Sequence, residues 1–206
     1  MRGKFVTFEG CEGSGKSTQI RLLSEKLTAL GVDFIVTREP GGSDIAEQIR
    51  AIILDGKNTA MCDECEALLY AASRVQHLRE KIEPSLAAGK LVICDRFVDS
   101  SLAYQGYARG LGEEYINEIN SVALKHYTPD LTVFLNISPE DAFVRKHGAD
   151  KSDRMEQQGL EFHKKVYKGY AALMEKYPRI TPVECGGNKF ETAEKIFALL
   201  KDKGII

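Results

Sequence analysis

Residues 10–17 constrain this chain more than any other stretch. They read G-C-E-G-S-G-K-S, which fits the spacing G-x-x-x-x-G-K-S. An alternating run typical of a β-strand precedes them at residues 5–8, and a helical run follows at residues 18–30 and stops at Gly31. Glycines in such a turn let backbone N–H groups face inward, next to the positive end of the helix. The sequence therefore predicts a phosphate-binding loop.

The side chains of this region suit a bound nucleoside triphosphate and its metal ion. Lys16 can reach the β- and γ-phosphates of ATP, and the Ser17 hydroxyl can ligate Mg²⁺. Asp95 ends an apolar run, where a second metal-holding group is expected, although a turn-capping aspartate is the alternative. Arg96 follows at once and can bridge phosphates across a cleft. The predicted ATP-binding residues are Gly10, Cys11, Glu12, Gly13, Ser14, Gly15, Lys16, Ser17 and Thr18.

The rest of the chain alternates between the two periodicities of strand and helix. Apolar runs predict strands at residues 4–9, 33–37, 91–95, 131–137 and 179–183. Helical spacing predicts helices at residues 18–30, 43–54, 63–86, 113–125, from 138 onward, 162–177 and from 188 onward. This alternation predicts an α/β fold of the P-loop NTPase class, with three layers (α/β/α) around a five-stranded parallel sheet. We expect one domain over residues 1–206, with a short mobile lid at about residues 145–156.

Polar residues mark several of the expected helix starts. Asp63 and Glu66 form a predicted capping box for the long third helix, in which Pro84 can introduce a kink or break. Ser138 is a predicted cap before Pro139. Asn188 is a predicted cap for the last helix.

Composition restricts the environment and the partners. The net charge of −2 gives no global basic field that would recruit nucleic acid or an anionic membrane, so any anion site must be local. No apolar run approaches the roughly 18 residues of a membrane span. Five cysteines without framework spacing favour reduced thiols and a cytoplasmic location, and Cys62 and Cys65 are interpreted as unrelated residues at a helix start.

Several arginines accompany the phosphate-binding motif. Each one alone is typical of a solvated surface charge. Together they suit phosphoryl transfer between two bound nucleotides, because planar guanidinium groups satisfy the spread charge of the transferred group. These arginines are Arg38, Arg50, Arg74, Arg145 and Arg154.

Six stretches of this chain together resemble the thymidylate kinase family. They are residues 10–18, 37–42, 70–74, 95–97, 100–106 and 153–156. They keep the family's order over nearly the whole chain, and R-E-P-G-G and S-x-x-x-Y-Q-G are more specific than the phosphate loop. The resemblance implies transfer of the ATP γ-phosphate to dTMP, giving dTDP and ADP with Mg²⁺, by a homodimer.

The resemblance also implies how the acceptor nucleotide is bound. Tyr70 would stack on thymine, and Arg74 would donate a hydrogen bond to its carbonyl edge. Ser101 and Gln105 would lie near the base, and Tyr104 near the sugar, where it could disfavour a ribose 2′-hydroxyl. Packing in the core is the alternative for both tyrosines.

Charged residues would hold the acceptor's phosphate and sugar in the same family pattern. Arg38 and Arg50 would clamp the acceptor phosphate, and Arg96 would bridge the donor and acceptor phosphates. Glu12 would repel phosphate if it pointed inward, so we expect it to point toward a sugar hydroxyl of the acceptor.

The phosphate loop contains no arginine, which resembles the family members that place basic residues in the lid instead. The predicted candidates for the cation at the transferred phosphate are Arg145, Lys146, Lys151 and Arg154. A solvated charged face is the alternative for each of them. The middle of the lid departs from the arginine-rich version of the family, with H-G-A at residues 147–149. Asp150 and its neighbours are predicted to close only over both substrates.

Three other functions are alternatives to this interpretation. A deoxynucleoside kinase would act on an unphosphorylated acceptor, against which the arginines on the acceptor side argue. A GTPase-like switch is suggested only by N-K-F-E at residues 188–191, and no D-x-x-G element follows the central strand. A nucleic-acid motor disagrees with the acidic charge balance.

Overall fold

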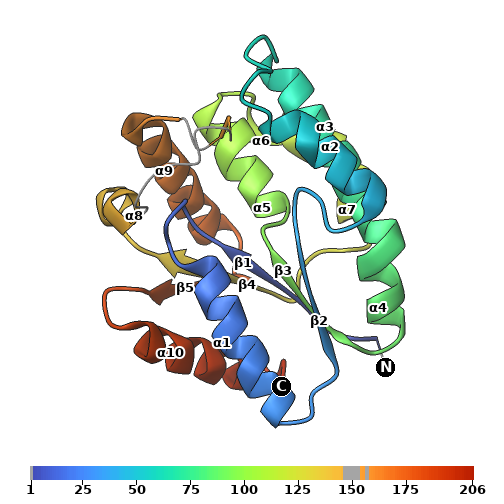
Figure 1. Ribbon diagram of the computed structural model, residues 1–206, viewed down its shortest axis with the longest axis vertical. Coiled ribbons are helices and arrows are strands. Elements are labelled where there is room, and N and C mark those ends of the chain that lie inside the picture. The colour runs from blue at the N-terminus through green and yellow to red at the C-terminus, as the bar shows by residue number, and fades with distance from the viewer. Residues whose placement is uncertain (1, 146–153, 156–157) are drawn as a thin grey trace.

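The computed structural model describes residues 2–145, 154–155 and 158–206 of the chain (Figure 1). Its centre is a five-stranded parallel sheet in the order β2-β3-β1-β4-β5. The strands are β1 (Phe5–Glu9), β2 (Phe34–Arg38), β3 (Leu91–Asp95), β4 (Leu131–Asn136) and β5 (Ile180–Glu184). The predicted α/β fold class is confirmed, and each strand lies within a residue or two of its expected place.

The central strand β1 is buried along its whole length. It pairs in parallel with β3, where Phe8 lies opposite Asp95, and with β4, where Phe8 lies opposite Val133. Strands covered on both faces by helices read as continuous apolar runs, which is why β1, β3 and β4 were visible in the sequence. Because all the strands are parallel, the phosphate loop after β1 and Asp95 at the end of β3 meet at one edge of the sheet.

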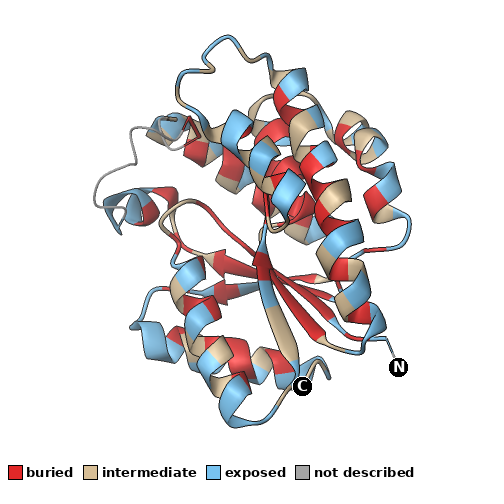
Figure 2. Ribbon diagram, turned by 45° about the vertical axis from the view of Figure 1, so that its right-hand side comes forward, coloured by how far each residue is buried: buried red, intermediate tan, exposed pale blue. Residues whose placement is uncertain are grey.

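Helices cover both faces of the sheet, and Figure 2 shows the buried sheet between them. On one face α1 (Lys16–Ala29) packs beside α10 (Lys189–Asp202). The other helices are α2 (Asp44–Leu54), α3 (Asp63–His77), η1 (Leu78–Ile82), α4 (Glu83–Ala87), α5 (Val98–Ser101), η2 (Leu102–Ala108), α6 (Glu113–Ile119), α7 (Ser121–Leu124), α8 (Pro139–Arg145) and α9 (Leu160–Lys176). The π-helical segment η2 packs closely against α9.

Two expected helices are interrupted. The helix predicted at residues 63–86 changes to the π-helical segment η1 just before Pro84, which lacks the N–H that a regular helix would use. The helix predicted at residues 113–125 breaks at Asn120, whose buried amide donates to the Ile116 carbonyl and accepts from Arg74. The sequence did not predict the helical segments α5 and η2 at residues 98–108.

The predicted caps have mixed outcomes. Asn188 accepts hydrogen bonds from two backbone N–H groups, and Ser138 accepts one from Asp141, so both caps are confirmed. The capping box of Asp63 and Glu66 is wrong. Cys62 is the N-cap residue of α3 without a side-chain hydrogen bond, and the Glu66 carboxylate turns inward to pair with basic residues.

The predicted lid falls largely outside the described residues. Of residues 145–156, the structure describes Arg145, Arg154 and Met155. The predictions for the rest of the lid concern residues outside the described part of the chain, namely Lys146, the H-G-A stretch at residues 147–149, Asp150, Lys151 and the flanking residues 153 and 156.

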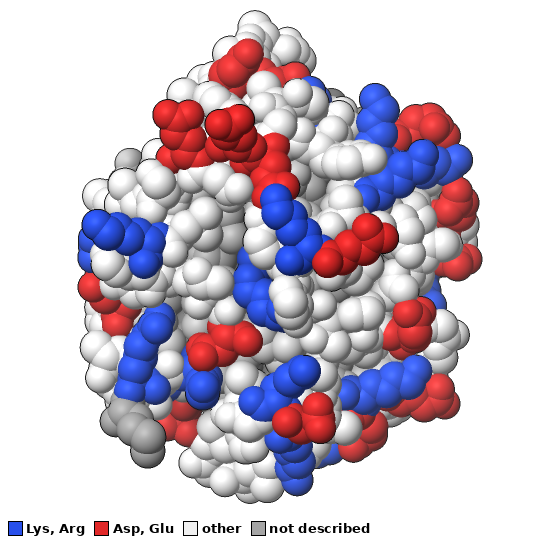
Figure 3. Space-filling view, turned by 180° about the vertical axis from the view of Figure 1, so that it is seen from behind, with Lys and Arg blue, Asp and Glu red and all other residues white. Residues whose placement is uncertain are grey.

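The exposed surface mixes both signs of charge. Figure 3 shows acidic and basic side chains interspersed on the face seen from behind, with no single basic field on it. Among the helices of the described residues, none is both long enough and apolar enough to cross a membrane.

Candidate active site

A cleft of about 460 Å³, called here the main cleft, lies at the carboxyl edge of the sheet. Thirteen of the predicted site residues line it: Glu12, Gly13, Gly15, Lys16, Ser17, Thr18, Arg38, Arg50, Tyr70, Asp95, Arg96, Tyr104 and Gln105. Five lining residues were not predicted: Glu39, Pro40, Leu54, Ser100 and Met155. Segments far apart in the sequence thus converge on one hollow, as the parallel topology requires.

The phosphate loop has the backbone that its glycines allow. Gly13 (φ 79°) and Gly15 (φ 94°) take left-handed conformations, and Gly15 is the N-cap residue of α1. Lys16 is buried, and its Nζ donates to the carbonyl oxygens of Gly10 (3.2 Å) and Cys11 (3.3 Å). Burial, followed by the nearby charge of Arg96, lowers the pKa of Lys16. The protein therefore holds a cation at the loop at an energetic cost, which an anion in the main cleft would offset.

The residues expected to hold a metal ion fit that task. Oδ1 of Asp95 is buried and has no hydrogen-bond partner in the described structure, and the exposed Ser17 lines the same cleft. The described residues contain no group of three or more His, Cys, Asp or Glu side chains that could hold a metal ion. Mg²⁺ keeps several waters and takes one or two protein ligands together with phosphate oxygens, so Asp95 and Ser17 are enough to hold it beside ATP.

Arg96 is held at the centre of the main cleft in an unusual backbone conformation. Its φ is +70°, in the left-handed region that is costly for residues with a side chain. Its guanidinium donates to the Gly10 carbonyl and to Ser100 Oγ, both at 3.1 Å, and forms an ion pair with Glu12. It also lies 5.1 Å from the centre of the Tyr104 ring. The turn after β3 thus aims Arg96 back at the phosphate loop.

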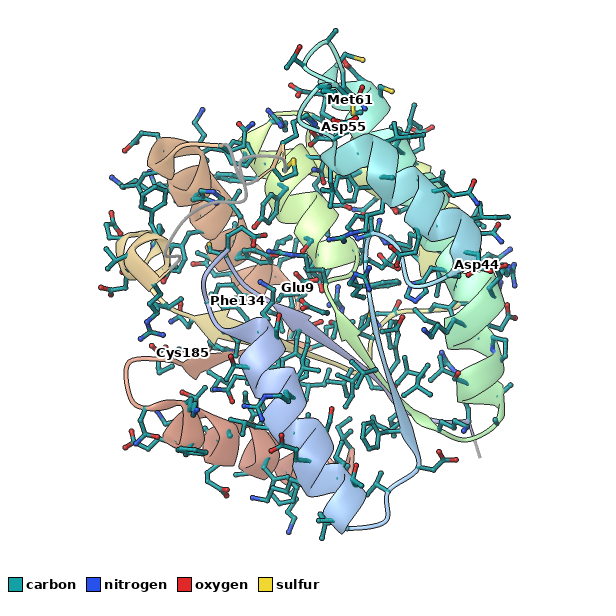
Figure 4. All side chains as sticks on the ribbon, viewed as in Figure 1. Glu9, Asp44, Asp55, Met61, Phe134 and Cys185 are labelled. Carbon is teal, nitrogen blue, oxygen red and sulfur yellow. The ribbon has the colours of Figure 1, made fainter. Side chains whose placement is uncertain are left out.

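Glu9, labelled in Figure 4, is a buried acid that was not predicted from the sequence. Its carboxylate accepts from the backbone N–H of Phe97 (2.7 Å), from Ser100 Oγ (2.5 Å) and from the Tyr170 hydroxyl (2.7 Å). Burial and the nearby charge of Asp99 raise the pKa of Glu9 to about 7. Glu9 therefore braces the turn that carries Arg96. Its position as the last residue of β1, directly before the loop, was the available signal.

The loop after β2 brings two predicted arginines to the main cleft. Arg38 donates to the carboxylate of Glu47 (2.9 Å), and Arg50 donates to the carbonyl of Pro40 (2.8 Å). The Glu39-Pro40 peptide bond is cis. Arg38 is exposed and Arg50 is half-buried, so both can reorient toward an anion.

Arg74 and Ser101 lie behind the surface of the main cleft and do not line it. The Arg74 guanidinium donates to Glu39 Oε2 (2.7 Å), the Asn120 side chain (2.5 Å), Ser101 Oγ (3.0 Å) and the carbonyl of Phe97 (3.2 Å). The structure thus places Arg74 as a strut between helices and the loop after β2. Direct contact of Arg74 or Ser101 with a base remains a prediction.

Aromatic and amide side chains form the remaining wall. The Tyr104 ring packs edge-on against Tyr170 at 6.4 Å and Phe162 at 6.1 Å, so the predicted packing alternative describes part of its environment. Its buried hydroxyl has no hydrogen-bond partner among the described residues. Gln105 donates its amide to Glu66 (2.7 Å) and lines the main cleft beside Tyr70 and Met155.

The two described lid arginines do not line the main cleft. Arg145 donates to the carbonyl of Cys185 (3.0 Å) and borders a second hollow of about 400 Å³ at the ends of β4 and β5. Arg154 is buried and binds the carboxylate of Glu66 and the carbonyl of Ile53. In this conformation neither guanidinium meets Lys16 or Arg96.

Comparison with known proteins decides the family. The Thymidylate kinase family model matches residues 8–196. The chain is 48% identical over 203 residues to the thymidylate kinase of Clostridium novyi, with 97% of each chain covered. It is 47% identical over 206 residues to that of Bacillus pumilus, with 98% of this chain and 97% of the relative covered. The chain belongs to the thymidylate kinase family.

A solved structure agrees with this assignment. The crystal structure of thymidylate kinase from Ehrlichia chaffeensis matches with a TM-score of 0.78 and 30% identity, over 98% of this chain and 100% of the other. As a thymidylate kinase, the chain is an enzyme that transfers the γ-phosphate of ATP to dTMP and yields dTDP and ADP. The function and the enzyme class predicted from the sequence are thereby confirmed.

Within this thymidylate kinase, the predicted residues divide into those that face the main cleft and those that support it. Lys16, Arg96 and Asp95 face it, whereas Arg74 and Arg154 are paired behind it. This division was not predicted from the sequence, because arginines of both kinds occur in similar local motifs.

Proposed function

We propose that the main cleft holds dTMP and the phosphates of ATP end to end, with the transferred group between Lys16 and Arg96. One observation carries this proposal. Lys16 Nζ and Arg96 Nη1 donate to the same atom, the carbonyl oxygen of Gly10, at 3.2 and 3.1 Å. Two cations from different elements therefore converge at one point, where charge stabilisation of a phosphoryl transfer state is most effective.

On the ATP side, the backbone N–H groups of the loop and the N-terminus of α1 bind the phosphate oxygens. Lys16 exchanges its two carbonyl partners for the β- and γ-phosphates. The loop residues Gly10, Cys11, Glu12, Gly13, Ser14, Gly15, Ser17 and Thr18 complete this cradle. Positioning, rather than covalent chemistry, is the main contribution of these groups.

Mg²⁺ would be held by Ser17 and by Asp95, directly or through water. When bound, the ion neutralises charge on the phosphate oxygens of ATP. The unpaired Oδ1 of Asp95 supports this assignment, because a buried carboxylate oxygen without a donor is costly unless a cation or water satisfies it.

On the dTMP side, Arg38 and Arg50 bind the acceptor phosphate in place of their present partners Glu47 and Pro40. Arg96 then bridges both phosphates. Its ion pair with Glu12 holds that carboxylate at the rim, from where it can bind a sugar hydroxyl of dTMP. For Arg50 the exchange replaces a hydrogen bond to a neutral carbonyl with a charge-assisted bond to phosphate, whereas Arg38 exchanges one anionic partner for another.

The base of dTMP would lie against Tyr70, Tyr104 and Gln105. Tyr70 stacks on the ring, and the unpaired hydroxyl of Tyr104 faces the sugar. Arg74 and Ser101 remain proposed contacts of the base edge, although in the present conformation they bind each other. Their pairing supports an additional positioning role, since Arg74 links Ser101 to Glu39 in the wall of the main cleft.

Arg145 and Arg154 remain candidates for the lid cation. Arg145 borders the second hollow next to the carboxyl ends of β4 and β5, on the ATP side of the sheet. Arg154 would first have to leave Glu66. Among the described arginines, Arg96 is therefore the best-placed candidate to contact the transferred phosphate.

The enzyme would act as a homodimer in the cytoplasm. The neighbouring helices α2 and α3 expose Ile45, Ile52 and Leu68, each about half accessible, which supports a helical interface between two copies.

A nucleotide panel tests this function. ADP release should be measured with ATP and each acceptor, with Mg²⁺ titrated. We expect turnover with dTMP and none with thymidine. The Asp95→Asn variant should need at least tenfold more Mg²⁺ for half-maximal rate, with an unchanged dTMP KM. Activity with thymidine but not dTMP would indicate a deoxynucleoside kinase instead.

A further inference from the structure

A buried carboxylate stands directly behind the amide that faces the acceptor base. Glu66 has no exposed surface and lies in the first turn of α3. Its Oε1 accepts a hydrogen bond from Gln105 Nε2 at 2.7 Å. Gln105 comes from η2, a different element, and lines the main cleft. This pair therefore links the interior of the protein to the cleft surface.

Two guanidinium groups form ion pairs with Glu66. Arg109 pairs with Glu66 Oε2 at 3.1 Å, and Arg154 pairs with the same oxygen. Arg109 is itself placed by Asp63 at 3.3 Å and by the face of Phe162 at 5.0 Å. In these ion pairs the carboxylate oxygens of Glu66 accept hydrogen bonds and donate none.

This pairing fixes the orientation of the Gln105 amide. The two ends of a glutamine amide have nearly the same shape, so without a neighbour the group could present either its oxygen or its NH₂ to a ligand. Glu66 can bind only the NH₂ end. The carbonyl oxygen is thereby the free end, and no described residue donates a hydrogen bond to it. Gln105 offers the main cleft an acceptor.

We propose that Glu66 is a specificity-determining positioning residue that fixes Gln105 as a hydrogen-bond acceptor for the ring N–H of thymine. Thymine and uracil carry a donor at ring nitrogen 3, whereas cytosine carries an acceptor there. A fixed oxygen at this point binds the former and repels the latter. The selected class is a deoxypyrimidine monophosphate with a protonated ring nitrogen. This inference rests on the proposed binding of dTMP beside Gln105.

The energetic basis for selectivity is the cost of an unmatched buried polar group. A site that is built to hydrogen-bond one group rejects an analogue without it strongly, because the site's own polar atom is left unpaired. If the amide could rotate freely, it would adapt to either base and discriminate little. Selectivity therefore depends on Glu66, which does not have to touch the nucleotide.

The first test measures kcat/KM for dTMP and for dCMP in the wild-type enzyme and in Glu66→Gln. A glutamine at 66 can donate as well as accept, so it releases the Gln105 amide. We expect the dTMP KM to rise about tenfold, the loss of roughly one hydrogen bond to a ligand. The dTMP to dCMP preference should fall at least tenfold, while kcat and the ATP KM change less than threefold.

Arg109→Met is the matched control. It removes another partner of the same carboxylate but leaves the contact between Glu66 and Gln105. We expect lower thermal stability and an unchanged dTMP to dCMP preference. Glu66→Asp keeps an anion and should restore part of the preference that Glu66→Gln loses. An unchanged preference in folded Glu66→Gln overturns the proposal.

Glu66→Gln leaves two arginines without their anionic partner and is expected to lose stability, so a second measurement uses the wild-type protein. The side-chain amide protons of Gln105 are observed by NMR after labelling glutamine with ¹⁵N, and assigned by their absence in Gln105→Met. Downfield, exchange-protected protons before nucleotide is added support the proposal. A rapidly exchanging amide overturns it. Absence of dTMP turnover in the wild type would instead defeat the proposed function.

Discussion

The two walls of the main cleft satisfy their charges in opposite ways. On the ATP side, Asp95 Oδ1 and Ser14 Oγ are buried without partners in the described structure, and Lys16 binds only backbone carbonyls. On the dTMP side, Glu39 and Glu66 are each paired with arginine, and both carboxylates are fully or almost fully buried. The polar groups on the ATP side have no partners until phosphates and a metal ion bind. The carboxylates on the dTMP side are already paired with arginine.

This difference matches what each wall is proposed to bind. Phosphate groups and a metal ion supply the missing charges themselves, so the ATP side can leave its groups unmatched until they arrive. A pyrimidine is neutral and is read by the direction of its hydrogen bonds, which requires side chains that cannot turn. Internal ion pairs on the dTMP side provide that rigidity. Mutations should therefore affect turnover on one wall and stability on the other.

The largest effect is expected at Lys16. Lys16→Met should reduce kcat for dTMP about 10³-fold, equivalent to about 4 kcal/mol, because it removes a cation from the transferred phosphate. The melting temperature should not fall, since burial already lowers the pKa of Lys16 and the protein no longer buries a charge. Steady-state kinetics and calorimetry measure both. A strongly destabilised Lys16→Met variant would contradict the expectation that mutations on the ATP side affect turnover rather than stability.

Arg74 on the opposite wall should show the reverse pattern. Arg74→Met leaves the Glu39 carboxylate buried without its guanidinium, and we expect a loss of about 3–5 kcal/mol in the free energy of unfolding. Urea denaturation measures this loss. The double variant with Glu39→Gln removes both charges and should recover part of it. Equal losses in the single and double variants would show that the pair is not coupled.

Glu9 should make the free energy of unfolding depend on pH. Its folded pKa of about 7 lies above the ordinary value of 4.5, so the folded state binds the proton more tightly than the unfolded state. The resulting stability is fully present below about pH 4.5 and is lost as the pH rises through about 7. At roughly 1.4 kcal/mol per unit, up to about 3 kcal/mol is at stake.

The measurement compares wild type with Glu9→Gln, which cannot ionise at this position. Between pH 4.5 and 8 the wild type should lose stability relative to the variant in denaturant titrations. Parallel pH profiles of the two proteins would show that Glu9 does not take up a proton in this range.

The smallest effect on stability is expected from the backbone conformation at Arg96. Both Arg96→Ala and Arg96→Gly remove the guanidinium and should be nearly inactive. Only glycine relieves the strain of φ +70°, so Arg96→Gly should be more stable than Arg96→Ala by about 1 kcal/mol. Thermal unfolding of the two variants tests this order. Equal stability would indicate that the turn relaxes when the side chain is removed.

Much of this enzyme was predictable because its signals are local. The buried strands were predicted because apolar runs between helices indicate a parallel sheet. The phosphate loop was predicted because its glycine, lysine and serine residues occur at a fixed spacing. Helix breaks were harder to predict. The helix breaks at Asn120, whose side chain accepts a hydrogen bond from Arg74. Arg74 is far away in the sequence, so the residues around Asn120 do not predict this contact.

The sequence alone determined the order of strands and helices, the phosphate loop and the chemical types that meet at the carboxyl edge of the sheet. Only the tertiary structure decided which arginines face the cleft and which brace it, since Arg50 and Arg74 differ in their partners rather than in their local patterns. It also decided that Glu66 points inward to a charged cluster instead of capping its helix. Charge pairing depends on three-dimensional distance and burial, and neither is encoded in the spacing of residues along the chain.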